Sequence, residues 1–102
     1  MLDAAETAIG LAEGLDKADF LADRVLVDAA IKNISVLGEA AMHVPDDVTK
    51  LWPDIPWRKM RDMRNVIIHE YFGVNPEILW GTIQEDLPAL VPALRRMGES
   101  GS

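Results

Sequence analysis

The hydrophobic pattern predicts helices along the whole chain, because apolar residues recur every three or four positions and no stretch shows the sustained alternation of a β-strand. The first expected helix covers residues 2–15, with Gly14 close to its end. Its apolar positions are Ala5, Ala8, Ile9, Ala12 and Leu15. Residues 16–22 are expected to form a connection or a short helical turn, and Asp23 could cap the helix that follows.

The longest expected helix covers residues 24–44. Its polar residues form one stripe, made of Asp28, Lys32, Ser35 and Glu39. The remaining apolar arc is wider than the roughly 100° stripe with which a helix covers a single core. This helix must therefore bury two sides, either at the centre of a bundle or against another chain. We interpret Asn33 as a core amide with a hydrogen-bond partner, and His43 as a surface or helix-end histidine.

Prolines divide the second half of the chain. Pro45 ends the long helix, and residues 46–51 are expected to form one short helical turn. Pro56 is placed in the first turn of a helix over residues 57–71, where its missing N–H costs nothing.

The last helix is expected to begin at Pro76, with Asn75 as its N-cap, and to run towards Met97. Its predicted inner face consists of Ile78, Leu79, Ile83, Leu87, Leu90 and Leu94. Pro88 and Pro92 should kink or divide it. Residues 1–97 thus form one expected domain, and residues 98–102 a flexible C-terminal tail.

The composition of the 102 residues, with 49% apolar and 26% charged, is typical of one ordinary folded domain. The absence of cysteine excludes disulfides and thiolate chemistry. Asp3 and Glu6 stand where a signal peptide would be basic, and the apolar runs are too short to span a membrane. We therefore expect a cytoplasmic protein without a membrane partner.

Residues 57–71 are basic, although the net charge of the chain is −7. The segment contains Arg58, Lys59, Arg61 and Arg64 against Asp62 and Glu70, which gives +2 locally (4 − 2) and leaves −9 elsewhere (−7 − 2). An acidic body with one basic cleft would admit a phosphate there and repel polyanions elsewhere. The simpler alternative is that these charges only keep an exposed helix soluble.

Helical geometry groups the polar side chains of this segment. At about 100° per residue, one arc of roughly 80° holds Arg58, Arg61, Asn65 and His69, with Met60, Met63 and Ile67 on the opposite side. Arg64 lies beside this front, on the same side of the helix as Tyr71. One helix could therefore aim a guanidinium, an imidazole and a phenol at one groove.

These residues suit cleavage of RNA by its own 2′-hydroxyl. An imidazole ordinarily titrates near neutrality and can move the proton, while a fixed cation stabilises charge on the phosphorus. One histidine cannot easily act as both base and acid in one step, so a dimer supplying two would be useful. A metal site has little support, since the two histidines lie far apart. Glu39 and Glu70 stay open as ligands, but a metal-free mechanism needs fewer assumptions.

The spacing Arg64-x(4)-His69-x-Tyr71 resembles the R-x(4)-H-x-Y signature of HEPN ribonucleases. Its surroundings also resemble the HepT-like branch of that family, over about residues 2–97. The similar stretches are Leu37-Gly38-Glu39-Ala40-Ala41, Pro53-Asp54-Ile55-Pro56-Trp57-Arg58, Tyr71-Phe72-Gly73-Val74 and Ile78-Leu79-Trp80.

The resemblance implies an all-α, HEPN-type up-down bundle of four to five helices, homodimeric, with a cleft shared by both chains. It implies a metal-independent endoribonuclease without a cofactor, acting as the toxin of a type VII toxin–antitoxin pair with a nucleotidyltransferase antitoxin. His69 would be the general acid or base and Arg64 would bind the phosphate. The further RNA contacts would come from Arg58, Arg61, Asn65 and Tyr71. Tyr71 would also be the residue to which the antitoxin attaches AMP.

Two other interpretations stay open. A catalytically inactive HEPN module would bind nucleotide or dock a nucleotidyltransferase, and a plain helical scaffold would only dimerise. The presence of both Arg64 and His69 favours the enzyme. Tyr71 could instead be a packing residue at a helix end.

Overall fold

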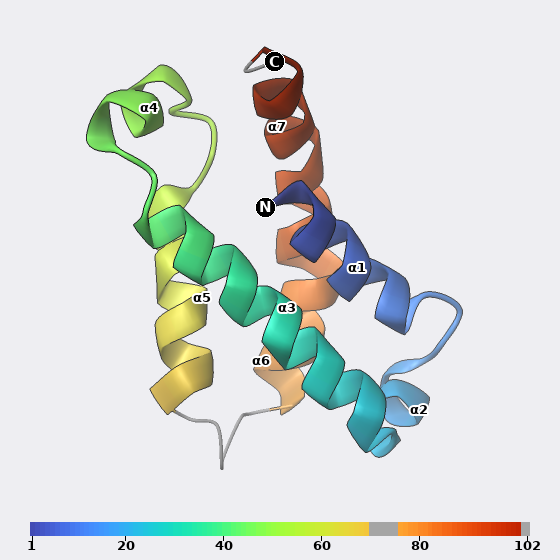
Figure 1. Ribbon diagram of the computed structural model, residues 1–102. Helices are drawn as coiled ribbons and strands as arrows, with labels where there is room; N and C mark the ends of the chain where they lie inside the picture. Colours follow the sequence, from blue (N-terminus) through green and yellow to red (C-terminus); the bar gives the residue numbers. More distant parts are fainter. Residues whose placement is uncertain (70–75, 101–102) are drawn as a thin grey trace.

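The computed structural model describes residues 1–69 and 76–100, and within them leaves out the side chains of residues 64–69, 76, 99 and 100. The helices are α1 (Leu2–Ala12), α2 (Lys17–Ala22), α3 (Arg24–Met42), α4 (Asp46–Leu51), α5 (Trp57–His69), α6 (Pro76–Gly81) and α7 (Leu87–Ser100), with a π-helical segment at Thr82–Asp86 (Figure 1). No strand occurs among these residues. The predicted all-α class is confirmed.

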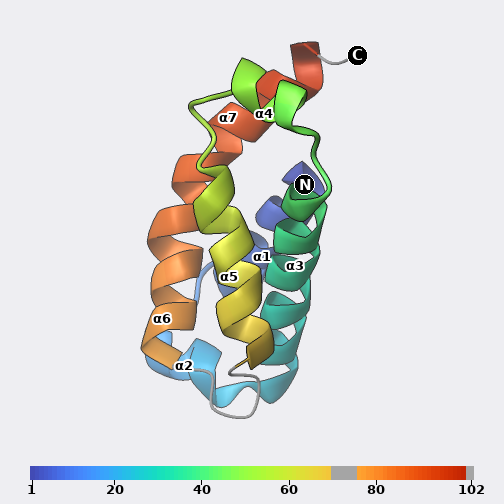
Figure 2. The same cartoon turned by 90° about the vertical axis from the view of Figure 1, so that its left-hand side faces the viewer.

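The long helices form a bundle around α3. This helix packs against α1 and α5, and α1 also packs against α7. Figures 1 and 2 show α6, the π-helical segment and α7 as one long rod beside the others, with α2 and α4 near opposite ends. The short helices therefore lie at the ends of the bundle, and α5 is held between α3 and the rod.

Aspartates cap the N-termini of two helices. Asp16 Oδ1 accepts a hydrogen bond from the Asp19 amide at 2.8 Å at the start of α2. Asp23 Oδ1 accepts bonds from the Val25 and Leu26 amides at 3.1 and 3.3 Å, which confirms the predicted cap of α3. Gly14 adopts a φ of +79° just after α1, a conformation that glycine allows without strain.

α3 buries two sides within its own chain. Its buried residues are Ala30, Ile31, Ile34, Leu37, Gly38 and Ala41. The central position between α1 and α5 accounts for the wide apolar arc, so that arc does not by itself require a second chain. Asn33 is half-buried and donates a hydrogen bond from Nδ2 to the Ala29 carbonyl at 2.8 Å. His43 is exposed at the C-cap, as predicted, with its Nε2 3.2 Å from Glu39 Oε1.

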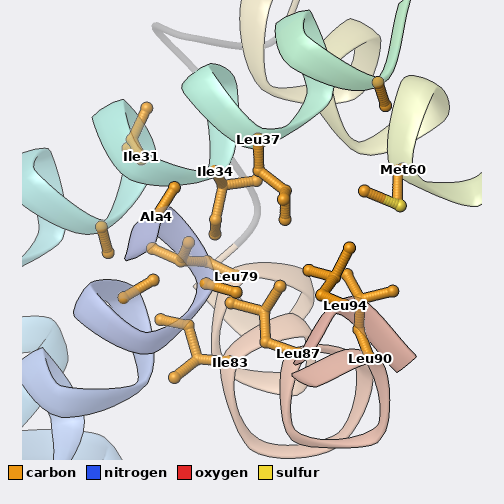
Figure 3. Close-up of a cluster of buried hydrophobic side chains, with 14 of the residues drawn as sticks. Ala4, Ile31, Ile34, Leu37, Met60, Leu79, Ile83, Leu87, Leu90 and Leu94 are labelled. Atoms are coloured by element: carbon orange, nitrogen blue, oxygen red, sulfur yellow. The ribbon is translucent and has the colours of Figure 1, made fainter. Parts of the chain in front are cut away.

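The core joins all four long helices. Figure 3 shows Ile31, Ile34 and Leu37 of α3 facing the leucines and isoleucine of the rod, with Ala4 from α1 and Met60 from α5 at its sides. The fully buried larger side chains are Phe20, Ile34, Leu37, Ile55, Met60, Ile83, Leu87 and Leu94. A single apolar cluster therefore fixes the position of α5.

The last helix differs from the prediction in three details. Leu79 and the later inner-face residues are buried, but Ile78 is 52% exposed, so its placement in the core was wrong. The rod stays helical past both prolines, and the division takes the form of a π turn that contains Gln84. Proline clashes with the carbonyl four residues earlier, and Gln84 is that residue for Pro88. The helix also continues through Ser100, three residues beyond the predicted end at Met97.

Candidate functional site

α5 begins at Trp57, directly after Pro56. The Pro56 carbonyl accepts the first helical bond, from the Met60 amide at 3.0 Å. Pro56 therefore precedes the helix and does not lie in its first turn as predicted. Trp57 is buried and donates its indole N–H to the Trp52 carbonyl at 3.0 Å. Together with the fully buried Met60, this bond anchors the first turn of α5 in the core.

Polar contacts fix both flanks of α5. Arg61 is half-buried and donates its Nε–H to the Ala41 carbonyl of α3, over an N···O distance of 3.3 Å. On the other flank, Lys59 Nζ donates to Asp86 Oδ1 of the π-helical segment at 2.8 Å. The first half of α5 is thus tied to both neighbouring elements.

No other described helix covers the outer face of α5. Figure 2 shows α5 between α3 and the rod with no other helix in front of it. Arg58 and Asp62 are exposed there, and the Arg58 side chain makes no hydrogen bond or ion pair with other described side chains or backbone. Among the predicted RNA-binding arginines, Arg58 is therefore available and Arg61 is partly engaged in the fold.

The motif residues share this helix. α5 extends to His69, so the backbones of Arg64, Asn65 and His69 are helical. Their side chains lie outside the description, as does Tyr71 altogether. The helical register places His69 on the side of Arg58 and Asp62, whereas Arg64 follows Met60 and Arg61 by one turn. The structure brings the backbones together on one helix, and the distance between the motif side chains stays a prediction.

A surface hollow of ≈ 260 Å³ lies between α5 and the rod. Lys59 and Met63 line it from α5, with Glu85 and Asp86 from the π-helical segment. Its carboxylates make it a poor place for a phosphate. Sequence analysis did not find this hollow, because it depends on the π turn. The pair Glu85-Asp86 just before Pro88 was the only sequence signal for it.

Metal ligation has no candidate in the described part of the chain, where no three His, Cys, Asp or Glu side chains are grouped to hold an ion. Within the same residues, no helix has the length and apolar character needed to cross a membrane.

The chain belongs to the HepT-like ribonuclease family, whose pattern matches residues 1–97. It is 46% identical over 72 residues to the protein named "Probable ribonuclease HepT" of Thermococcus cleftensis, covering 71% of this chain and 66% of that protein. It is 36% identical over 90 residues to "Putative RNase TTE0752" of Caldanaerobacter subterraneus subsp. tengcongensis, covering 88% and 80%. No solved structure matches the chain. Family and relatives support ribonuclease activity in general.

Proposed function

We propose that this protein is a metal-independent endoribonuclease that cleaves RNA through attack of the 2′-hydroxyl on the adjacent phosphate. The observation that carries the proposal is the position of the Arg64-x(4)-His69 motif on α5, in a chain matched by the family over residues 1–97. The uncovered outer face of α5, with exposed Arg58, gives single-stranded RNA an approach.

Each side chain has a chemical role in this proposal. His69 takes the proton from the 2′-hydroxyl or gives one to the leaving 5′-oxygen. Arg64 binds the non-bridging phosphate oxygens and stabilises the charge that develops in the transition state. Arg58 holds a neighbouring phosphate, while Asn65 and Tyr71 contact the RNA.

A homodimer completes the proposed site. One histidine is a poor base and acid for the same step, whereas two α5 helices facing one cleft would supply two histidines and two arginines. The exposed outer face of α5 is free to meet a second copy. Light scattering should then give twice the chain mass at micromolar concentration, and a stable monomer with full activity would contradict this assembly.

The decisive experiment measures cleavage of a fluorophore- and quencher-labelled single-stranded RNA by purified variants. His69→Ala should lower the cleavage rate by about 10²–10⁴-fold, the usual contribution of a positioned proton-transfer group. Arg64→Ala should lower it by about 10²–10³-fold, the usual contribution of a donor that stabilises charge in the transition state. Their losses should combine less than additively, because both act in one transition state. Chelator should leave the rate unchanged.

Two substitutions elsewhere serve as matched controls. His43→Ala removes an exposed histidine at the end of α3, and Arg24→Ala removes an exposed arginine at its start. Both should cleave at the wild-type rate. Cleavage that persists in His69→Ala would contradict the mechanism. A wild-type protein that binds RNA or nucleotide without cleaving it would instead favour the inactive HEPN module.

We further propose that the protein is a toxin whose partner, a minimal nucleotidyltransferase, attaches AMP to Tyr71. The added phosphate would compete with RNA for Arg64. Tyr71→Phe should therefore retain most cleavage and escape silencing by that enzyme and ATP. Mass spectrometry after co-expression measures the modification. An adenylyl group on another residue, or silencing without any, would contradict this regulation.

A further inference from the structure

The cation at the C-terminal end of α3 is the Arg61 side chain of another helix, α5. The last carbonyls of a helix lack partners within it and carry partial negative charge. α3 has no basic residue in its last turn. Arg61 of α5 instead donates its Nε–H to the carbonyl of Ala41, the second-last residue of α3, at 3.3 Å. The guanidinium therefore joins the end of one helix to the side of the other.

The neighbouring arginine provides a comparison within one turn. Arg61 is half-buried, whereas Arg58 is exposed and makes no bond with the rest of the described chain. The buried residue Trp57 lies four positions before Arg61, so the two side chains are neighbours on the helix surface. Two arginines that look alike in the sequence thus occupy different surroundings.

We propose that Arg61 is a positioning residue, which closes the end of α3 and fixes the rotation of α5 about its own axis, and not a phosphate ligand. The assignment rests on the proposed ribonuclease function. Arg61 lies three residues before Arg64, so its bond acts close to the motif. A rotation of about 10° moves an atom at the outer helix radius of about 5–6 Å by roughly 1 Å. Misplacement of that size can slow a reaction about a hundredfold.

The bond is testable because glutamine reproduces the donor of arginine without its charge. In both side chains the fourth atom beyond Cα is a nitrogen that carries hydrogen, Nε in arginine and Nε2 in glutamine. Methionine has a similar length and no donor. Arg61→Gln therefore keeps the proposed contact, and Arg61→Met removes it. The Val44 amide, 3.4 Å from the same Ala41 oxygen, keeps that carbonyl paired in either variant.

The first measurement is the rate of cleavage of the labelled single-stranded RNA. Arg61→Met should lower kcat about tenfold or more with KM within about twofold, because the RNA still binds to a misplaced site. Arg61→Gln should keep kcat within about threefold of the wild type. Equal losses in both variants would overturn the proposal, since a phosphate ligand is lost with the charge in either case.

The second measurement is the salt dependence of RNA binding, made in the His69→Ala background so that the RNA stays intact. Each phosphate contact contributes about 0.7 to the slope of log K against log salt for a single strand. Arg58→Gln should lower the slope by about that amount, and Arg61→Gln should leave it unchanged. A slope lowered by Arg61→Gln as much as by Arg58→Gln would overturn the assignment.

Hydrogen exchange separates this proposal from the proposed function. Amides of residues 61–69 should exchange faster in Arg61→Met than in wild type, and at the wild-type rate in Arg61→Gln. This pattern would support the positioning role even if the wild-type protein cleaved no RNA, which would defeat the proposed function alone. Identical exchange in all three proteins would overturn the positioning role. Should Arg61→Met fail to fold, the rate and salt slope of Arg61→Gln still decide between the two roles.

Discussion

α3 and α5 are neighbours that are held in different ways. α3 lies between α1 and α5 and buries apolar side chains on both sides. Among its described side chains, α5 buries Trp57 and Met60, packs Met63 against the core, and makes polar contacts from Arg61 to α3 and from Lys59 to the π-helical segment. No other described helix lies in front of its outer face. One helix builds the scaffold, and the other carries the motif.

This difference separates the residues on which folding depends from those to which we assign the proposed chemistry. Apolar burial has no preferred direction and tolerates many polar changes nearby. A hydrogen bond fixes distance and orientation, but its net contribution to stability is only about 0.5–1.5 kcal/mol. Substitutions in α3 should therefore act on stability, whereas substitutions in α5 should act mainly on the placement of the site.

The largest effect is expected at Leu37, which is fully buried in α3. Leu37→Ala should lower the free energy of unfolding by about 2–5 kcal/mol, from lost transfer energy and the cavity left behind. Urea denaturation measures it, and cleavage per folded molecule should be unchanged. Val36→Ala, one residue earlier and 50% exposed, is the control and should change stability by less than about 0.5 kcal/mol. Similar losses of unfolding free energy in the two variants would contradict the claim that the buried side of α3 holds the fold together.

A smaller effect is expected at Trp57, the apolar anchor of α5. Trp57→Phe keeps an aromatic ring and removes the N–H that bonds to the Trp52 carbonyl. The bond should contribute about 0.5–1.5 kcal/mol to the free energy of unfolding, measured in urea. Trp80→Phe is the control, because its half-buried ring packs against Phe20 and its N–H has no partner in the described chain. A loss of stability in the control as large as that in Trp57→Phe would mean that the smaller ring, and not the missing bond, accounts for the effect.

The sequence predicted the scaffold well, because its signals are local and periodic. The cap at Asp23, the wide arc of α3 and the inner face from Leu79 to Leu94 were all predicted from spacing. The cap at Asp16 was not predicted. Ile78 was misplaced because it lies only about 100° from Leu79 on the helix. Near the end of the bundle only Leu79 is buried in the core, and Ile78 is exposed. Pro56 was misplaced by one residue, which is the ordinary uncertainty of a helix boundary.

The site could be predicted only in part. The motif on α5 is recognisable from the order of Arg64 and His69 in the sequence. The different surroundings of Arg58 and Arg61 cannot be recognised from the sequence, since both residues lie on the polar side of the helix. Their difference depends on the Ala41 carbonyl, 20 residues earlier, which only the packing of α3 on α5 brings near. Spacing along a helix cannot reveal a partner on another helix.

The smallest effect is expected for the ion pair between Lys59 and Asp86, whose side chains are 56% and 27% exposed. A double-mutant cycle with Lys59→Gln and Asp86→Asn should give a coupling energy of about 0.2–1 kcal/mol, because water and salt screen exposed charges. The coupling should fall as salt is raised. The pair Arg24 and Asp28 within α3, at 3.9 Å, is the control and should couple still more weakly. A Lys59–Asp86 coupling well above 1 kcal/mol would mean that this ion pair holds α5 as firmly as its buried first turn does. That result would contradict the contrast between α3, held by apolar burial, and α5, held partly by weak polar contacts.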